Sequence, residues 1–215
     1  MTWRTMNAAH QLASTFGALA GLAGIEHGVG EILQGNRAPG GIVIESWPHS
    51  ALFRILGGEP ALTLVPNLLV TGILAVSVAL ALLVWAVAFV QRKRGGLILI
   101  LLSVAMFLVG GGFGSALVGV IAGAVGTRIT APHTWWRAHL SVNAQRVLAT
   151  VWPWSFGAAL MAWLTLLPGA LIIGAVVPRI DSNVIYGLIV CAFSTLAVTI
   201  MLGLAHDSYK HIGSR

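Results

Sequence analysis

Long apolar runs separated by short polar stretches dominate this sequence. The pattern predicts membrane helices over about 8–30, 61–90, 95–110, 113–127, 154–177 and 183–205. A helix of roughly 20 apolar residues is long enough to cross a hydrocarbon core about 30 Å thick. We therefore expect an all-α fold, a polytopic transmembrane helix bundle with five to six membrane segments, in a single membrane domain over residues 1–215.

The apolar region 95–127 is too long for one upright helix and short for two full ones. Three consecutive glycines, Gly110–Gly112, interrupt it. Glycine tolerates turn geometry and weakens a helix interior. We expect the chain to turn back at this triplet, as a helical hairpin or a re-entrant segment.

The basic residues lie at the edges of the apolar runs. If region 95–127 turns back, one membrane face carries Arg4, Arg92, Lys93, Arg94, Arg128, Arg137, Arg146, Lys210 and Arg215, and the other carries Arg37, Arg54 and Arg179. If it crosses once, this bias disappears. The positive-inside rule therefore favours the hairpin, with both termini cytoplasmic and the protein in the plasma (inner) membrane.

Two connecting segments have patterns of their own. In residues 134–151, Trp136, Val147 and Val151 fall on one helical face and Arg146 on another. This pattern predicts an amphipathic helix in the plane of the cytoplasmic interface, ended by Pro153. Residues 34–60 form the external connection, where Trp47 is expected to anchor at the bilayer interface.

Composition agrees with a membrane location. The chain is 57% hydrophobic and 8% charged, with a mean hydropathy of +0.90. A soluble domain has about 25% charged residues, so that class is excluded. The net charge of +6 sits at segment edges, which favours the lipid bilayer and not nucleic acid as its partner. The single cysteine, Cys191, excludes an internal disulfide and a cysteine zinc cluster.

The end of the first apolar segment carries Glu26, His27 and Glu31. Ionisable residues inside a span cost roughly 2.5–3.5 kcal/mol each on insertion scales, so each requires an explanation. His27 and Glu31 share a helix face, which suits half of a site for a hard or borderline divalent metal, or a proton-relay pair. The alternative is a hydrogen-bonded pair that only orients the helix.

The external connection supplies further candidates for the same end of the first segment, namely Glu45, His49 and Glu59. The HExxH zinc signature, the Walker loop and the GxGxxG fingerprint are all absent from the sequence. These residues therefore form a possible site and not a motif.

Small residues mark helix contacts. Gly17, Gly21, Gly24 and Gly28 recur at helical spacing, and we interpret them as a face for close helix packing, within the chain, by self-association or with other membrane subunits. The stripe Gly111, Ser115, Gly119, Ala122 and Gly126 has the same character.

The last segment places Cys191, Thr195, Thr199 and His206 along one face, with Asp207 beside His206. Such a stripe lines a solute or ion pathway or makes ordinary interhelical hydrogen bonds. His10 falls at the same membrane side as His206 and His211 on the hairpin topology. Two such histidines could ligate a haem, although the sequence has no CxxCH attachment and specifies no cofactor.

Three function classes remain open on the sequence. The intramembrane polar residues slightly favour translocation of a small solute, an ion or protons. The glycine faces suit an accessory or structural subunit of a larger membrane complex. The His/carboxylate groups also allow a metal- or haem-dependent membrane enzyme.

Overall fold

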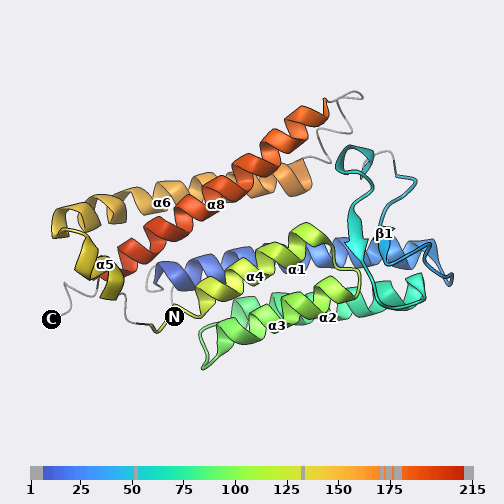
Figure 1. The fold of residues 1–215 in the computed structure, drawn as a ribbon, viewed down its shortest axis with the longest axis horizontal. Helices are drawn as coiled ribbons and strands as arrows, with labels where there is room; N and C mark the ends of the chain where they lie inside the picture. Colours follow the sequence, from blue (N-terminus) through green and yellow to red (C-terminus); the bar gives the residue numbers. More distant parts are fainter. Residues whose placement is uncertain are drawn as a thin grey trace. The chain divides into compact units, whose positions relative to one another are not determined.

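The computed structural model describes residues 7–50, 53–131, 134–169, 172, 176 and 181–210. Within these ranges the chain is mainly helical, as expected, with one short two-stranded sheet. It divides into two compact units, Ala13–Thr127 and Met1–Leu12 with Arg128–Arg215. Figure 1 shows the ribbon of both units.

The unit Ala13–Thr127 is built from four helices and a small sheet. Its elements are α1 (Ala8–Gln34), β1 (Val43–Glu45), the 3-10 helix η2 (Phe53–Leu56), β2 (Pro60–Leu62), α2 (Leu68–Ala88), α3 (Gly95–Leu108) and α4 (Phe113–Gly126). Only the first residues of α1 belong to the other unit. The predicted segment 8–30 is thus one helix that continues for another turn.

The predicted helix over 61–90 was wrong at its start. Residues Pro60–Leu62 pair with β1 as an antiparallel strand, and α2 begins only at Leu68. Pro66 disfavours helical geometry in the residue before it and has no amide hydrogen to donate. Asn67 then caps the helix, since its side-chain oxygen accepts a hydrogen bond from the Val70 amide at 3.1 Å.

The prediction that region 95–127 turns back at its glycines is confirmed. Helix α3 ends at Leu108, α4 begins at Phe113, and the two lie side by side (Figure 1). Gly110 and Gly112 have φ of 96° and 84°, a region that residues with a side chain rarely adopt. At about 1.5 Å per residue, each helix is roughly 21 Å long, shorter than a hydrocarbon core of about 30 Å.

The glycine stripe of α1 packs inside the unit. A Cβ on Gly21 would lie 3.0 Å from the Ala79 carbonyl oxygen, and one on Gly28 would lie 2.8 Å from that of Gly72. Gly17 meets Ala86 of α2 and Leu99 of α3 in the same way. Without side chains between them, α1 approaches the backbone of α2 directly, as small-residue stripes allow.

The connection between α1 and α2 folds back over the end of α1. The Ser46 and Trp47 amides donate to the carbonyls of Glu59 and Gly58, which extends the pairing of β1 with β2. Trp47 stacks on Phe53 with a centroid distance of 4.7 Å and also meets Gly30 of α1. The Trp47 ring, expected at the bilayer interface, is thus held by contacts within the chain.

The second unit contains α5 (Thr134–His139), α6 (Val142–Leu164), the π-helical turn η3 (Thr165–Gly169), α8 (Ser182–Lys210) and the start of α1. Helices α6 and α8 lie side by side (Figure 1). The Trp163 indole donates to the Ala192 carbonyl at 3.0 Å, and the Thr199 hydroxyl donates to the Ser155 carbonyl at 2.9 Å.

The boundaries predicted around residues 134–177 were also wrong. The helix breaks before Val142 and then runs through Pro153, so 134–151 is not one continuous helix. At this break the Ser141 hydroxyl caps the start of α6 by accepting a hydrogen bond from the Ala144 amide at 3.3 Å. Gln145, in the first turn of α6, is only 1% exposed. Beyond Gly169, the predicted segment 154–177 lies outside the described residues except at 172 and 176.

The exposed surface of these helices is apolar. Small residues face inward along α2, including Gly72, Ala75, Ala79 and Ala86. Large ones face outward, including Val70, Ile73, Leu80, Val84 and Val87. Among the described residues, three helices are long and apolar enough to cross a membrane, over Leu68–Ala88, Val142–Leu167 and Asn183–Tyr209. A water-soluble fold would bury such side chains, so this arrangement indicates a membrane protein.

Candidate cation site at the end of the first helix

The candidate site begins with two polar residues of α1 that the fold buries. His27 is 5% exposed and Glu31 is 0% exposed. They lie one helical turn apart, so both point to the same side of α1. The sequence-predicted pair is thus enclosed in the unit and not on its surface.

The glycine turn between α3 and α4 closes over this pair. A Cβ on Gly110 would collide with the Glu31 carboxylate, and one on Gly112 would collide with the His27 ring. The turn is fixed in place because the Leu64 amide donates to the Leu108 carbonyl at 3.0 Å and Thr63 bridges to Val109. Glycine is required here for its backbone conformation and for the space it leaves.

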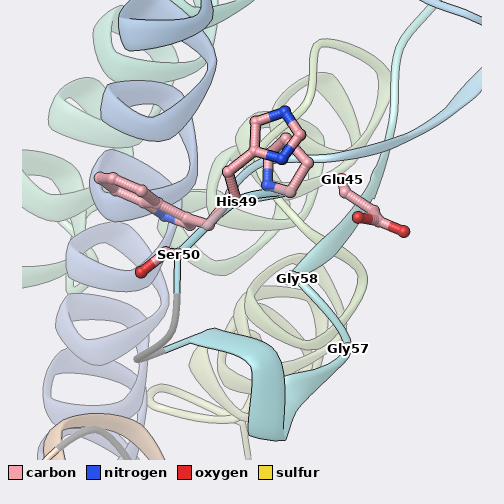
Figure 2. Close-up of a pocket in the computed structure, with 7 residues that line it drawn as sticks. Glu45, His49, Ser50, Gly57 and Gly58 are labelled. Carbon is pink, nitrogen blue, oxygen red and sulfur yellow. The ribbon is translucent and has the colours of Figure 1, made fainter.

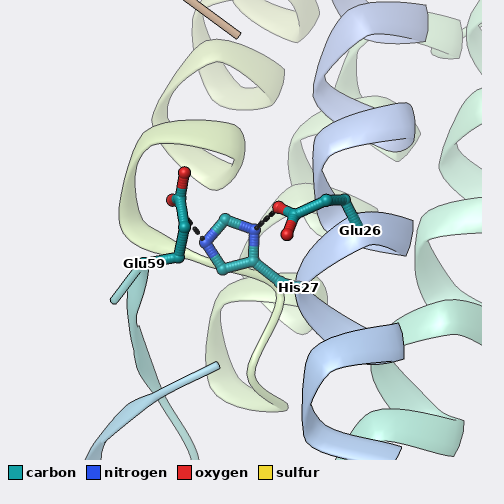
Figure 3. A group of neighbouring side chains, drawn as sticks. All are labelled: Glu26, His27 and Glu59. Carbon is teal, nitrogen blue, oxygen red and sulfur yellow. Dashed lines mark ion pairs between the residues drawn. The ribbon is translucent and has the colours of Figure 1, made fainter. Parts of the chain in front are cut away.

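Glu59 reaches the site from the loop before β2. Gly57, Gly58 and Glu59 have φ of 66°, 74° and 58°, so a left-handed run ends at a residue with a side chain. This backbone directs the Glu59 carboxylate to the His27 ring, with Oε2 at 3.2 Å from Nε2 (Figure 3). Left-handed geometry in such a residue persists where its surroundings enforce it, as at functional sites.

Glu26 contacts the other nitrogen of the same ring. Its Oε2 lies 3.1 Å from His27 Nδ1, and that nitrogen is also 2.9 Å from the Ala23 carbonyl oxygen. Figure 3 shows the imidazole between the two carboxylates. One potential ligand atom from each of Glu26, His27 and Glu59 lies within 4.8 Å of the other two.

Glu31 extends this cluster. The Ser46 hydroxyl, which is also buried, donates to Glu31 Oε1 at 3.3 Å. The second oxygen, Oε2, is buried and has no hydrogen-bond partner in the described part of the chain. Ser46 is a site residue that the sequence pattern does not reveal, because only the loop's return over α1 places it there.

The other two loop candidates lie elsewhere. Glu45 and His49 are exposed and line a pocket of about 450 Å³ together with Trp47, Pro48, Ser50, Gly57 and Gly58 (Figure 2). Of the three loop residues expected over the end of α1, only Glu59 therefore joins His27.

The polar stripe of α8 makes hydrogen bonds within its own unit. Both Asp207 oxygens accept from the first amides of α1, at 2.7 Å from Ala8 and 2.9 Å from Ala9. The Thr195 hydroxyl donates to the carbonyl of Cys191 one turn earlier, at 2.7 Å. A carboxylate on exposed helix amides is a favourable cap.

The two histidines considered for haem also belong to this unit. His206 stacks on Trp152 with a centroid distance of 4.9 Å, and its Nδ1 lies 3.3 Å from Asp207 Oδ1. His10 is 4% exposed, and its Nε2 has no hydrogen-bond partner among the described residues. His211 lies outside the described residues.

The two polar groups therefore engage different ends of α1. In the described part of the chain, the buried carboxylate oxygens without a hydrogen-bond partner belong to Glu26 and Glu31, in the group around His27.

Comparisons with known proteins add no functional assignment. Protein-family models, curated proteins and solved structures give no significant match to this chain.

Proposed function

We propose that this protein is a multi-pass membrane protein that moves a small cation, a proton or a metal ion, across the bilayer, and that Glu31 is the group that carries it. The observation behind this proposal is the carboxylate of Glu31, which is 0% exposed and has one unpaired oxygen. The proposal includes five to six membrane segments formed by the apolar helices and the hairpin.

A buried carboxylate is costly unless something compensates it. Removing the ion from water costs several kcal/mol, and an unpaired oxygen recovers little of that cost. Ser46 supplies one hydrogen bond to Glu31. A proton or a metal ion would neutralise the charge of the carboxylate. For this reason intramembrane acidic residues commonly mark ion and proton pathways.

The hairpin above Glu31 gives the proposal a second support. Helices α3 and α4 are short, and in the non-helical turn between them Gly110 lies against Glu31 and Gly112 against His27. In transporters, broken helices bring irregular backbone to the ion site, where its polar groups become available to the ion. The same arrangement would let Glu31 exchange its cation when the glycine turn moves.

In the proposed orientation the protein lies in the plasma membrane and both termini are in the cytoplasm. Arg92, Lys93 and Arg94 join α2 to α3, and Gly96 lies against Thr127 at the end of α4. The basic turn and the end of α4 thus lie at the same end of the hairpin, which the positive-inside rule assigns to the cytoplasm. The cluster around His27 then lies toward the external side.

Flux through the purified protein tests this function. The protein is reconstituted into liposomes with an internal pH dye, and in parallel with a metal-sensitive dye, and an ion gradient is imposed. Glu31→Gln keeps the shape and an acceptor for Ser46 but removes the charge. We expect its flux to fall at least roughly tenfold below wild type.

The matched control is Glu45→Gln, which removes a carboxylate from the exposed pocket and should leave the flux unchanged. Gel filtration of both variants confirms that they remain folded. The proposal fails if wild-type protein carries neither protons nor metal ions faster than empty liposomes, or if Glu31→Gln carries them as fast as wild type.

A further inference from the structure

We propose that His27 and Glu59, supported by Glu26, form a binding site for a divalent first-row transition metal ion beside Glu31. This inference deepens the proposed function, on which it rests for the role of the metal as the transported cation. Binding at the site is a separate property and is tested separately.

The hydrogen bonding of His27 fixes which nitrogen is available. Nδ1 faces two acceptors, the Ala23 carbonyl at 2.9 Å and Glu26 Oε2 at 3.1 Å. Nδ1 must therefore carry the hydrogen. A histidine that donates from one nitrogen to a carbonyl or carboxylate, and presents the other to an ion, is the usual arrangement at metal sites.

The opposite nitrogen faces a carboxylate and not a donor. His27 Nε2 lies 3.2 Å from Glu59 Oε2, and both atoms have lone pairs when the imidazole is neutral. Two lone pairs repel at this distance, so a proton or a metal ion has to lie between them. The geometry thus creates a place for a cation.

The separation suits a metal ion. Bonds of about 2.0–2.1 Å to one tetrahedral ion place two ligand atoms roughly 3.3 Å apart. The Nε2 to Oε2 distance of 3.2 Å lies close to that value. Imidazole with carboxylates favours borderline ions such as Zn²⁺ over Ca²⁺ and Mg²⁺, which prefer oxygen ligands alone.

The charge of the cluster also favours a bound cation. Glu26 and Glu59 flank one imidazole, and Glu31 lies one helical turn from His27, so even the protonated imidazole carries less positive charge than the carboxylates carry negative charge. The described ion pairs of these carboxylates involve only His27. Buried oxygens of Glu26 and Glu31, Oε1 and Oε2 respectively, have no hydrogen-bond partner within the described ranges. A bound cation would give these unpaired buried oxygens a partner.

The site can be tested by metal binding alone. Full-length protein, purified with a tag that contains no histidine and stripped with a chelator, is titrated with Zn²⁺ by calorimetry. We expect one equivalent to bind tightly, with excess Mg²⁺ failing to compete. His27→Gln and Glu59→Gln should each weaken the binding by more than about 100-fold.

The matched controls are His49→Gln and Glu45→Gln, the same changes at exposed residues of the neighbouring pocket. Both should bind Zn²⁺ as wild type does. The inference is overturned if wild-type protein binds no Zn²⁺, or if His27→Gln binds it with wild-type affinity. In either case the imidazole between the two carboxylates holds a proton.

The two proposals can fail independently. Zinc binding that depends on His27, in a protein without any flux, would leave the metal site standing and overturn translocation. Proton flux that requires Glu31, in metal-free protein that binds no zinc, would overturn the metal site and leave translocation standing.

Discussion

At the scale of single residues, the candidate site requires glycine at positions where a side chain would collide with Glu31 or His27. Gly112 has a φ of 84°, and a Cβ at this position would meet the His27 ring. Gly114, two residues later in α4, has open space at the same position. Identical changes at these glycines therefore separate the effect of the site from that of helix propensity.

Replacing Gly112 with alanine should damage the site. The backbone conformation alone costs of order 1–3 kcal/mol for a residue with a side chain. The added methyl group also displaces His27. We expect a lower melting temperature in detergent and weaker Zn²⁺ binding for Gly112→Ala, whereas Gly114→Ala should match wild type in both. Equal behaviour of the two variants would show that the turn does not hold His27.

At the scale of elements, α1 is fixed at its start by α8 and at its end by the loop that covers it. The start is the clearer case because Asp207 is 1% exposed and accepts hydrogen bonds from both Ala8 and Ala9. Its pairing with the first turn of α1 explains a buried charge near the end of an apolar helix without assigning it to a pathway.

Removing the charge of Asp207 should therefore reduce stability more than flux. Asp207→Asn keeps one acceptor but loses the second hydrogen bond and the interaction with the helix dipole. We expect unfolding in detergent to become easier by about 1–2 kcal/mol. Flux per folded molecule should stay near the wild-type value. A stable variant with strongly reduced flux would instead place Asp207 on the ion pathway, as the sequence also allows.

At the scale of the whole molecule, the proposed topology predicts which loops each aqueous compartment reaches. A cysteine at Gly40, in the loop after α1, should face the outside, because this residue is exposed and has open space around it. A cysteine at Lys93, in the exposed turn between α2 and α3, should face the cytoplasm. The native Cys191 is first replaced by serine, so that each variant carries one thiol.

Labelling of intact cells with a membrane-impermeant maleimide distinguishes the two loops. We expect Gly40→Cys to react directly and Lys93→Cys to react only after permeabilisation. Reaction of both before permeabilisation, or in the opposite order, would contradict the orientation proposed from the basic residues.

Much of the helical fold follows from the sequence alone. Apolar runs fix the existence of α1, α2 and α8, and the glycine triplet fixes the break between α3 and α4. The reasons are local, because hydropathy and backbone freedom act within a few residues. The predicted starts of α2 and α6 were wrong. The apolar pattern continues across both positions, whereas the helices begin where Asn67 and Ser141 cap them.

The candidate site, like the fold, could be predicted only in part from the sequence. The sequence alone placed His27 and Glu31 on one face of a helix and offered Glu59 among three loop residues. Only the tertiary structure selected Glu59 over Glu45 and His49, added Ser46, and set the glycine turn over the pair. These choices depend on backbone that is distant in sequence, such as the left-handed run that ends at Glu59 and the strand pairing that holds it. Periodicity along one segment carries no information about such contacts.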